Sequence, residues 1–293
     1  MAVSQMCRHL TRRRECRQLD RTRRTILLTK YSICITHFNN APTLEKSLDS
    51  ILGQIDDRFE VVLVDSESDD GSEKILQKYE RDGKIKLLEQ KCNRGRGRQI
   101  AFENSSGDYI ISNMDMDDIA KPRLGELLDK YHRLCDGNLL WARSRDPNNF
   151  WGGENITIAP RKLIQDLGGW KDLQLEEDRE LASRAAKLGR YRWTFFSMFY
   201  STNPHEERRT FCGRIRFRYA SYRDRMRAGR KVKNPPGHGH LARTLIIAFV
   251  RLTLPLHVSH KSSETTKNFY PYSPSDFVDF GEQIDKSNEK SNV

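Results

Sequence analysis

Short apolar segments alternate with amphipathic segments along the first half of the chain. Residues 59–64 form a nearly continuous apolar run, which is typical of a strand buried on both faces. The expected elements alternate along the chain as strand 31–36, helix 44–52, strand 59–64, helix 73–79, strand 84–88, helix 99–104 and strand 109–112. This alternation on short connections predicts a mostly parallel, doubly wound, Rossmann-like α/β sheet.

The sequence indicates the helices and strands of the second half less clearly. The spacing of apolar residues predicts helices at 123–134, 158–167 and within 173–188, and a last strand at 191–200. Leu181, Ala185 and Leu188 are expected to share one face of the third of these helices. Nearer the N-terminus, Thr43 is the expected N-cap of the first helix.

Polar loops follow three of the expected strands, at residues 36–40, 65–71 and 115–118. The carboxyl ends of parallel strands meet at one edge of a sheet, and ligands of such sheets bind there. These three loops are therefore expected to converge on one cleft.

The sharpest motif is Asp115-Met116-Asp117-Asp118, which comes just after the fourth expected strand. Two carboxylates separated by one residue can bind a hard divalent cation through oxygen atoms. Mg²⁺ or Mn²⁺ shared with a diphosphate is the expected occupant. An acidic turn without a metal is the structural alternative, and the position at a strand end favours the metal site. His205 is a further candidate metal or phosphate contact, with an ordinary surface histidine as its alternative.

The pair Glu177-Asp178 lies at or near the start of an expected helix. One of these carboxylates is a candidate general base that takes a proton from an attacking hydroxyl. The structural alternative is a favourable interaction with the positive end of the helix dipole.

Residues 93–98 read Asn-Arg-Gly-Arg-Gly-Arg and lead into an expected helix. The glycines would expose backbone N–H groups, and Arg94 and Arg98 would add guanidinium groups, so the run is a candidate anion cradle. A plain basic turn is the alternative. The run is not a P-loop, because it lacks the Gly-Lys-Ser/Thr ending.

Trp170, preceded by Gly169, and Trp151 are candidates for a surface that binds a sugar acceptor. Aromatic faces stack on sugar rings. The alternative is that both tryptophans belong to the hydrophobic core.

The net charge of +11 is concentrated in two arginine-rich blocks, one before residue 25 and one at 208–233. Residues 1–30 are expected to form a basic, disordered extension, 204–258 a basic, amphipathic, membrane-proximal extension, and 259–293 a flexible tail. Basic blocks suit anionic surfaces such as lipid head groups. The apolar stretch 245–258 is too short and too interrupted to span a bilayer. Six cysteines without a C-x-x-C pair favour a reducing cytosol. The expected location is therefore cytoplasmic, including the cytoplasmic face of a membrane.

Seven segments, taken in order, resemble the inverting glycosyltransferases of family 2, which have the GT-A fold. They are residues 32–39, 64–72, 93–98, 107–110, 115–118, 167–170 and 177–189. The likeness covers roughly residues 31–200, and a GT-A catalytic domain is expected at 31–203.

The resemblance implies a role for each matching residue. Thr36, Phe38 and Asn39 would lie near the nucleoside, Asp65 would approach the base, and Asp178 would be the catalytic base, with Glu177 as the other candidate. Asp115 and Asp117 would contact the ribose and the metal diphosphate, supported by Asp118. Where the family often has two acidic residues after the second strand, Ser66 follows Asp65 here, which leaves UDP, GDP and dTDP open as the donor nucleotide.

The expected function is metal-dependent, inverting transfer of one sugar from a nucleoside-diphosphate sugar to a glycan or lipid-linked acceptor. A single transfer is expected because the Gln-x-x-Arg-Trp signature of processive polysaccharide synthases is absent. The alternative is a basic membrane- or nucleic-acid-binding protein with an inactive nucleotide-sugar pocket. Nucleic acid is the less favoured partner, because the acidic loops would repel a phosphate backbone.

Overall fold

The computed structural model describes residues 29–144, 155–200, 219–220, 222–227 and 273–281. Nearly all of the expected N-terminal extension lies outside these residues, as do His205, Trp151 and the apolar stretch 245–258. The expected membrane-proximal extension is described only within 219–227.

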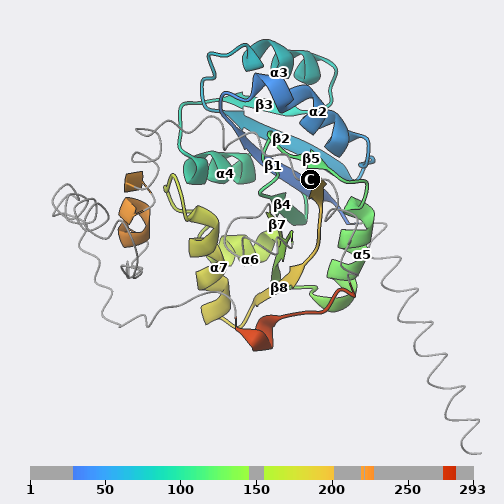
Figure 1. The fold of residues 1–293 in the computed structure, drawn as a ribbon, viewed down its shortest axis with the longest axis vertical. Helices are drawn as coiled ribbons and strands as arrows, with labels where there is room; N and C mark the ends of the chain where they lie inside the picture. The colour runs from blue at the N-terminus through green and yellow to red at the C-terminus, as the bar shows by residue number, and fades with distance from the viewer. Residues whose placement is uncertain (1–28, 145–154, 201–218, 221, 228–272, 282–293) are drawn as a thin grey trace, which may run out of the picture.

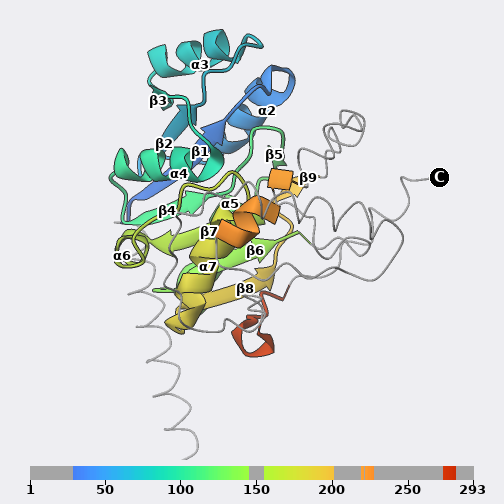
Figure 2. The ribbon, with the colours of Figure 1, turned by 90° about the vertical axis from the view of Figure 1, so that its left-hand side faces the viewer.

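Within the described residues, seven strands form one sheet in the order β3-β2-β1-β4-β7-β6-β8, and β5 pairs with β9 in a second, small sheet. Figure 2 shows the seven strands in this order from top to bottom. The strands are β1 Tyr31–His37, β2 Phe59–Asp65, β3 Lys86–Glu89, β4 Tyr109–Ser112, β5 Ile119–Ala120, β6 Leu139–Arg143, β7 Asn155–Pro160, β8 Tyr191–Phe195 and β9 Phe199–Tyr200. The helices are α2 Ala41–Leu52, α3 Ser72–Arg81, α4 Arg94–Glu103, α5 Leu124–Leu134, α6 Arg161–Asp166 and α7 Glu177–Lys187, followed by the 3-10 turn η1 Pro274–Asp276.

Most neighbouring strands of the large sheet run parallel. β1 pairs in parallel with both β2 and β4, β2 pairs in parallel with β3, and β6 pairs in parallel with β8. β7 runs antiparallel to both of its neighbours, β4 and β6. The prediction of a mostly parallel, doubly wound α/β sheet is confirmed.

Two hydrophobic clusters cover the two faces of the sheet. Side chains alternate along each strand, so Ile33 and Ile35 of β1 face one cluster while Cys34 faces the other. The first cluster contains apolar residues of α2, α3 and α5, and the second contains apolar residues of α4, α6 and α7. In Figure 1, α4 and α7 accordingly lie to the left of the sheet, and α2 and α5 to its right. Each large apolar side chain buried in these layers contributes about 1.5–3 kcal/mol.

Several predicted elements of the second half are wrong in detail. The helix expected at 158–167 begins only at Arg161, because the residues up to Pro160 pair with β4 and β6. Strand β6 was not predicted. The helix expected within 173–188 starts at Glu177, and Leu188 lies beyond its end and is 60% exposed. The strand expected at 191–200 is divided into β8 and β9.

Two predicted helix starts also differ. α2 begins after Asn40 rather than at Thr43, with proline in its first turn, where a missing N–H group costs no hydrogen bond. α4 begins at Arg94, five residues earlier than expected, because the side chain of Asn93 accepts a hydrogen bond from the Arg96 N–H at 2.9 Å and caps the helix. The Arg-Gly run therefore forms the first turns of α4 rather than a segment before the helix.

Residues 273–281 pack on the edge strand β8 instead of belonging to a flexible tail. The Val278 N–H donates to the Trp193 carbonyl at 3.0 Å, and the Trp193 indole N–H donates to the Ser273 carbonyl at 3.1 Å. Phe280 lies edge-on to Phe196, with ring centroids 6.2 Å apart. Aromatic side chains thus hold this segment over an edge that would otherwise be open.

Gly95 and Gly97 allow α4 to approach its neighbours closely. A Cβ atom at Gly95 would lie 2.0 Å from the carbonyl oxygen of Lys171, and one at Gly97 would lie 2.5 Å from Cγ2 of Thr36. The Gly95 N–H also donates to the Leu173 carbonyl at 2.9 Å. The glycines therefore serve packing between α4, β1 and the segment before α7.

This packing predicts opposite effects for two glycine substitutions in helices. Gly95→Ala should lower the free energy of unfolding by roughly 1–3 kcal/mol, because backbone must move to admit the methyl group. Gly125→Ala in α5 should raise it by about 0.4–1 kcal/mol, since no atom lies within 4 Å of the added Cβ. Denaturant midpoints measure both, and equal midpoints for the two variants would contradict the packing described for α4.

Candidate functional site

Arg98 of α4 lies close to three carboxylates from two other parts of the chain. Its Nη1 lies 2.6 Å from Oδ2 of Asp178 and also contacts the carboxylate of Glu177. Its Nη2 lies 3.7 Å from Oδ1 of Asp115, in the loop after β4. The Arg98 side chain is only 3% exposed. Two sets of predicted site residues, the acidic loop and the Glu-Asp pair, therefore meet at one buried guanidinium.

Burial and neighbouring charges shift the pKa values of Glu177, Asp178 and Arg98. Burial, together with the charge of Asp178, raises the pKa of Glu177. Burial also raises the pKa of Asp178, against the opposing effect of Arg98. Burial disfavours the charge on Arg98, but the charges of Asp178, Glu177 and Asp115 outweigh it and hold the pKa of Arg98 above its ordinary value. Of the two neighbouring carboxylates, Asp178 is the more accessible, with 16% of its side chain exposed against 4% for Glu177.

The turn before α7 places Trp170 next to Asp178. Gly168 and Gly169 both have positive φ, and the Trp170 N–H donates to Oε1 of Gln99 in α4 at 2.8 Å. The Trp170 ring is 4% exposed and packs edge-on against Phe102. Its indole N–H lies 3.3 Å from Oδ1 of Asp178. The open aromatic face expected for sugar stacking is therefore wrong, and Trp170 approaches the site through its N–H.

Asp224, which was not predicted, holds the residues just before α7. It is fully buried, and its Oδ2 accepts hydrogen bonds from the N–H groups of Gln174 and Leu175 at 2.8 and 2.9 Å. Arg225 donates to the carboxylate of Glu176 at 2.9 Å, next to the Glu-Asp pair. The sequence feature that could have indicated this role is the position of Asp224 as a single acidic residue among the arginines of 214–230.

The loop 115–118 presents oxygen atoms of the kind that hard divalent cations prefer. The Asp115 side chain is 36% exposed, whereas Met116 between the two aspartates is 1% exposed and anchored in the core. The carboxylates of Asp115, Glu177 and Asp178 surround Arg98 and the nearby Arg94. Among the described residues, no group of three or more His, Cys, Asp or Glu side chains is placed to hold a metal. The donor chemistry thus fits a divalent cation that takes further ligands from a bound phosphate.

The loops after β1 and β2 bind each other. The side-chain amide of Asn39 donates to the Asp69 carboxylate at 2.8 Å, and its side-chain oxygen accepts from the Asp69 N–H at 3.0 Å. Asp65 is 2% exposed, and both of its carboxylate oxygens accept from Ser68. Of the predicted nucleoside contacts, Asn39 and Asp65 are therefore engaged in loop structure.

The remaining predicted nucleoside and phosphate contacts differ in exposure. Phe38 is 57% exposed, and Thr36 is half-buried next to Gly97 of α4. Arg94 is exposed, and the negative charges of Asp115 and Glu177 hold the pKa of its guanidinium above its ordinary value.

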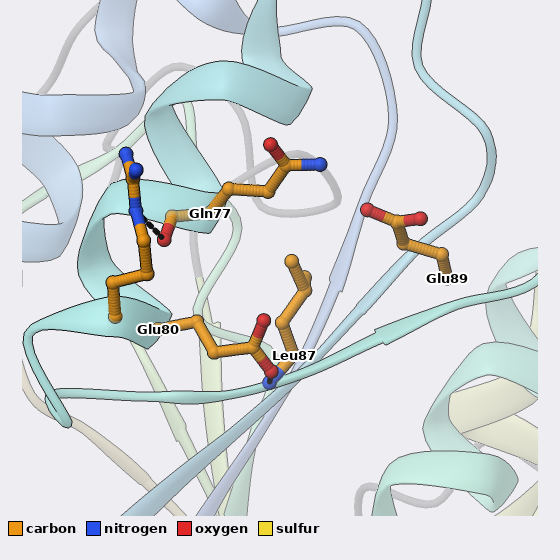
Figure 3. A pocket seen from close by; sticks show the side chains of 5 residues that line it. Gln77, Glu80, Leu87 and Glu89 are labelled. Atoms are coloured by element: carbon orange, nitrogen blue, oxygen red, sulfur yellow. Dashed lines mark hydrogen bonds between the residues drawn. The ribbon is translucent and has the colours of Figure 1, made fainter.

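A surface hollow between α3 and β3 shares no residue with this cluster. Figure 3 shows its lining, which consists of Gln77, Glu80, Arg81, Leu87 and Glu89. Glu80 accepts a hydrogen bond from the Leu87 N–H at 3.3 Å, so it satisfies a donor of the edge strand. The hollow belongs to the edge of the sheet rather than to the site.

No helix within the described parts of the chain is both long enough and apolar enough to cross a membrane.

Comparisons with known proteins agree with the fold. The mannosyltransferase PcManGT from Pyrobaculum calidifontis, solved with GDP-Man and Mn²⁺, superimposes with a TM-score of 0.55 and 20% identity over 76% of this chain and 73% of that one. Since the identity is low, this likeness shows the GT-A fold alone.

Two curated relatives match by sequence. The putative glycosyltransferase EpsE of Bacillus subtilis (strain 168) is 33% identical over 98 residues, 32% of this chain and 35% of EpsE. The GalNAc(5)-diNAcBac-PP-undecaprenol beta-1,3-glucosyltransferase of Campylobacter jejuni is 22% identical over 179 residues, 59% of this chain and 52% of that enzyme. The matches thus span between a third and about half of these relatives.

The family model for glycosyl transferase family 2 matches residues 32–224, more than half of the chain, and includes β1, Arg98, the acidic loop and the Glu-Asp pair. The chain belongs to glycosyl transferase family 2.

Proposed function

We propose that the chain transfers one sugar from a nucleoside-diphosphate sugar to an acceptor hydroxyl, with inversion at the anomeric carbon and with a divalent metal. One observation carries this proposal: Arg98 places Asp178, a candidate proton acceptor, beside Asp115, a candidate metal and phosphate contact. An inverting transfer needs these two functions on either side of one reacting carbon.

Asp115 and Asp117 would hold Mg²⁺ or Mn²⁺, with His205 as a further ligand. The bound cation would supply positive charge to the diphosphate leaving group. Arg94, which is exposed near Asp115, is the proposed second cationic contact to the diphosphate.

The nucleoside would lie over the carboxyl ends of β1 and β2. Thr36, Phe38, Asn39 and Asp65 are its proposed contacts. The known binding of GDP-Man by a protein of the same fold supports a nucleotide sugar as donor. UDP, GDP and dTDP all remain candidates for this chain.

Asp178 is the proposed general base. Its carboxylate would take the proton from the acceptor hydroxyl as that oxygen bonds to the anomeric carbon and the bond to the diphosphate breaks on the opposite face. Asp178 is favoured over Glu177 because its side chain is the more exposed of the two. The Trp170 N–H and Arg98 would orient the carboxylate.

The acceptor is proposed to be a glycan or a lipid-linked sugar, bound on the side of α7. A relative whose name includes an undecaprenol-linked substrate supports the lipid-linked form. The arginine-rich block after residue 207, followed by the apolar stretch 245–258, would hold the enzyme on an anionic membrane surface. A binding protein with an inactive pocket is not favoured, because the carboxylates that the chemistry needs are present and meet at Arg98.

Replacing a proposed metal ligand tests the metal dependence. Asp117→Asn should abolish the Mn²⁺-dependent rise in unfolding temperature caused by UDP, GDP or dTDP, because binding raises stability in proportion to occupancy. Asp129→Asn, an exposed substitution on α5, should respond like the wild type. Equal Mn²⁺-dependent shifts in wild type and Asp117→Asn would refute the metal assignment.

Two neighbouring substitutions separate the candidate bases. Asp178→Asn should slow sugar transfer by roughly 10²–10⁴-fold with little change in donor affinity, because only the chemical step loses its proton acceptor. Glu177→Gln should transfer faster than Asp178→Asn. The measurements are single-turnover rates and donor affinities for both variants. The reverse order would assign the role to Glu177, and normal turnover in both would remove α7 from the chemistry.

Vesicle binding tests the proposed membrane association. The full-length protein should sediment with anionic phosphatidylserine vesicles at low salt and dissociate as salt rises, because each basic residue near the surface contributes about 1 kcal/mol that ions screen. Neutral phosphatidylcholine vesicles are the control. A protein that stays in the supernatant with both would exclude this anchoring.

A further inference from the structure

Four polar side chains lie in a row along one face of α2 and the turn just after it: Thr43, Ser47 and Ser50 in the helix, and Gln54 two residues beyond its end. The spacing of four and three residues places Thr43, Ser47 and Ser50 on a single stripe of the helix, and Gln54 follows four residues later in the turn. Each one forms a hydrogen bond to the backbone of the segment that follows β4. We infer that this polar stripe of α2 positions the acidic loop 115–118 for metal and donor binding.

The strongest contact is at Met116, between the two aspartates proposed to hold the metal. The hydroxyls of Thr43 and Ser47 both donate to the Met116 carbonyl oxygen, at 2.8 and 2.9 Å. Two donors use both lone pairs of that oxygen. The Met116 side chain is 1% exposed and packs in the core with α2 residues. The peptide units that carry Asp115 and Asp117 are thus fixed at their shared neighbour.

The other half of the stripe fixes the chain beyond the loop. Oγ of Ser50 accepts from the Ala120 N–H at 2.9 Å, and Oε1 of Gln54 accepts from the Leu124 N–H at 3.0 Å. Leu124 is the first residue of α5, so Gln54 satisfies a donor that the helix itself leaves unpaired. The stripe therefore contacts this segment at every fourth residue from Met116 to Leu124.

α2 is also bound to the loop after β2. The Ala41 N–H, at the start of α2, donates to the Asp70 carboxylate at 2.8 Å. The helix thus contacts both the loop proposed to face the nucleoside and the loop proposed to hold the metal. A shift of α2 would displace one loop relative to the other.

This inference rests on the proposed metal-dependent donor binding, and its test separates the two. Thr43→Val removes one hydroxyl at nearly constant volume, Thr43→Ser keeps it, and Ser47→Ala removes the other. Mn²⁺ is titrated at a fixed UDP or GDP concentration, and the rise in unfolding temperature gives the Mn²⁺ concentration at half effect. Thr43→Val and Ser47→Ala should raise that concentration roughly three- to tenfold, at or below the usual effect of removing an outer-shell partner of a metal ligand.

The controls distinguish positioning from general stability. Ser105→Ala removes a hydroxyl that bonds the Phe102 carbonyl and Arg161, outside the stripe, and should lower stability without changing the Mn²⁺ midpoint. Thr43→Ser should retain the wild-type midpoint. If Ser47→Ala does not fold, Thr43→Val decides the question. Wild-type midpoints in the variants that lack a hydroxyl would overturn the inference, whereas a wild type without any Mn²⁺ response would overturn the proposed function instead.

Discussion

A buried guanidinium among three carboxylates is the interaction on which the site depends. Arg98 contacts Glu177 and Asp178 at the start of α7 and lies near Asp115 after β4. Without it, neighbouring carboxylates would remain buried with less opposing charge, and breaking a buried pair from one side costs about 3–5 kcal/mol. The same contact brings together the proposed phosphate-binding and proton-accepting groups, so the stability of this region and the proposed chemistry share one residue.

The elements around Arg98 are built to bring it close to its partners. Gly95 allows the first turn of α4 to touch the backbone at Lys171. Gln99, the residue after Arg98, accepts a hydrogen bond from the Trp170 N–H. Asp224 accepts a hydrogen bond from the backbone just before α7. The contacts of Gly95 and Gln99 fix the segment before α7 relative to α4, and Asp224 fixes the same segment from another part of the chain. The geometry of the carboxylates is therefore set by main-chain packing as much as by the ion pairs themselves.

Much of the fold could be predicted because each strand of the first half is an apolar run that a polar turn ends. β6 and β7 were harder to predict, since pairing with distant strands, rather than local pattern, decides the state of residues 158–160. In the site, Asp115 and Asp178 could be proposed from motif and resemblance. The partnership of Arg98 with Asp178 could not, because it joins residues 80 positions apart. Asp224 was missed for the same reason.

The reversed direction of β7 in the large sheet decides which strand ends lie beside the site. Because β7 runs against β4 and β6, β6 ends and β7 begins at the edge of the sheet where the acidic loop lies, and Asn113 after β4 bonds Asn155 at the start of β7. Arg143 at the end of β6 and Asn155 at the start of β7 therefore both lie at this edge. Substitutions at these two strand ends can alter the surroundings of the acidic loop while the pairings of β1, β2 and β3 remain unchanged. The parallel framework of β1, β2 and β3 can thus stay constant while local sequence change proceeds beside the acidic loop.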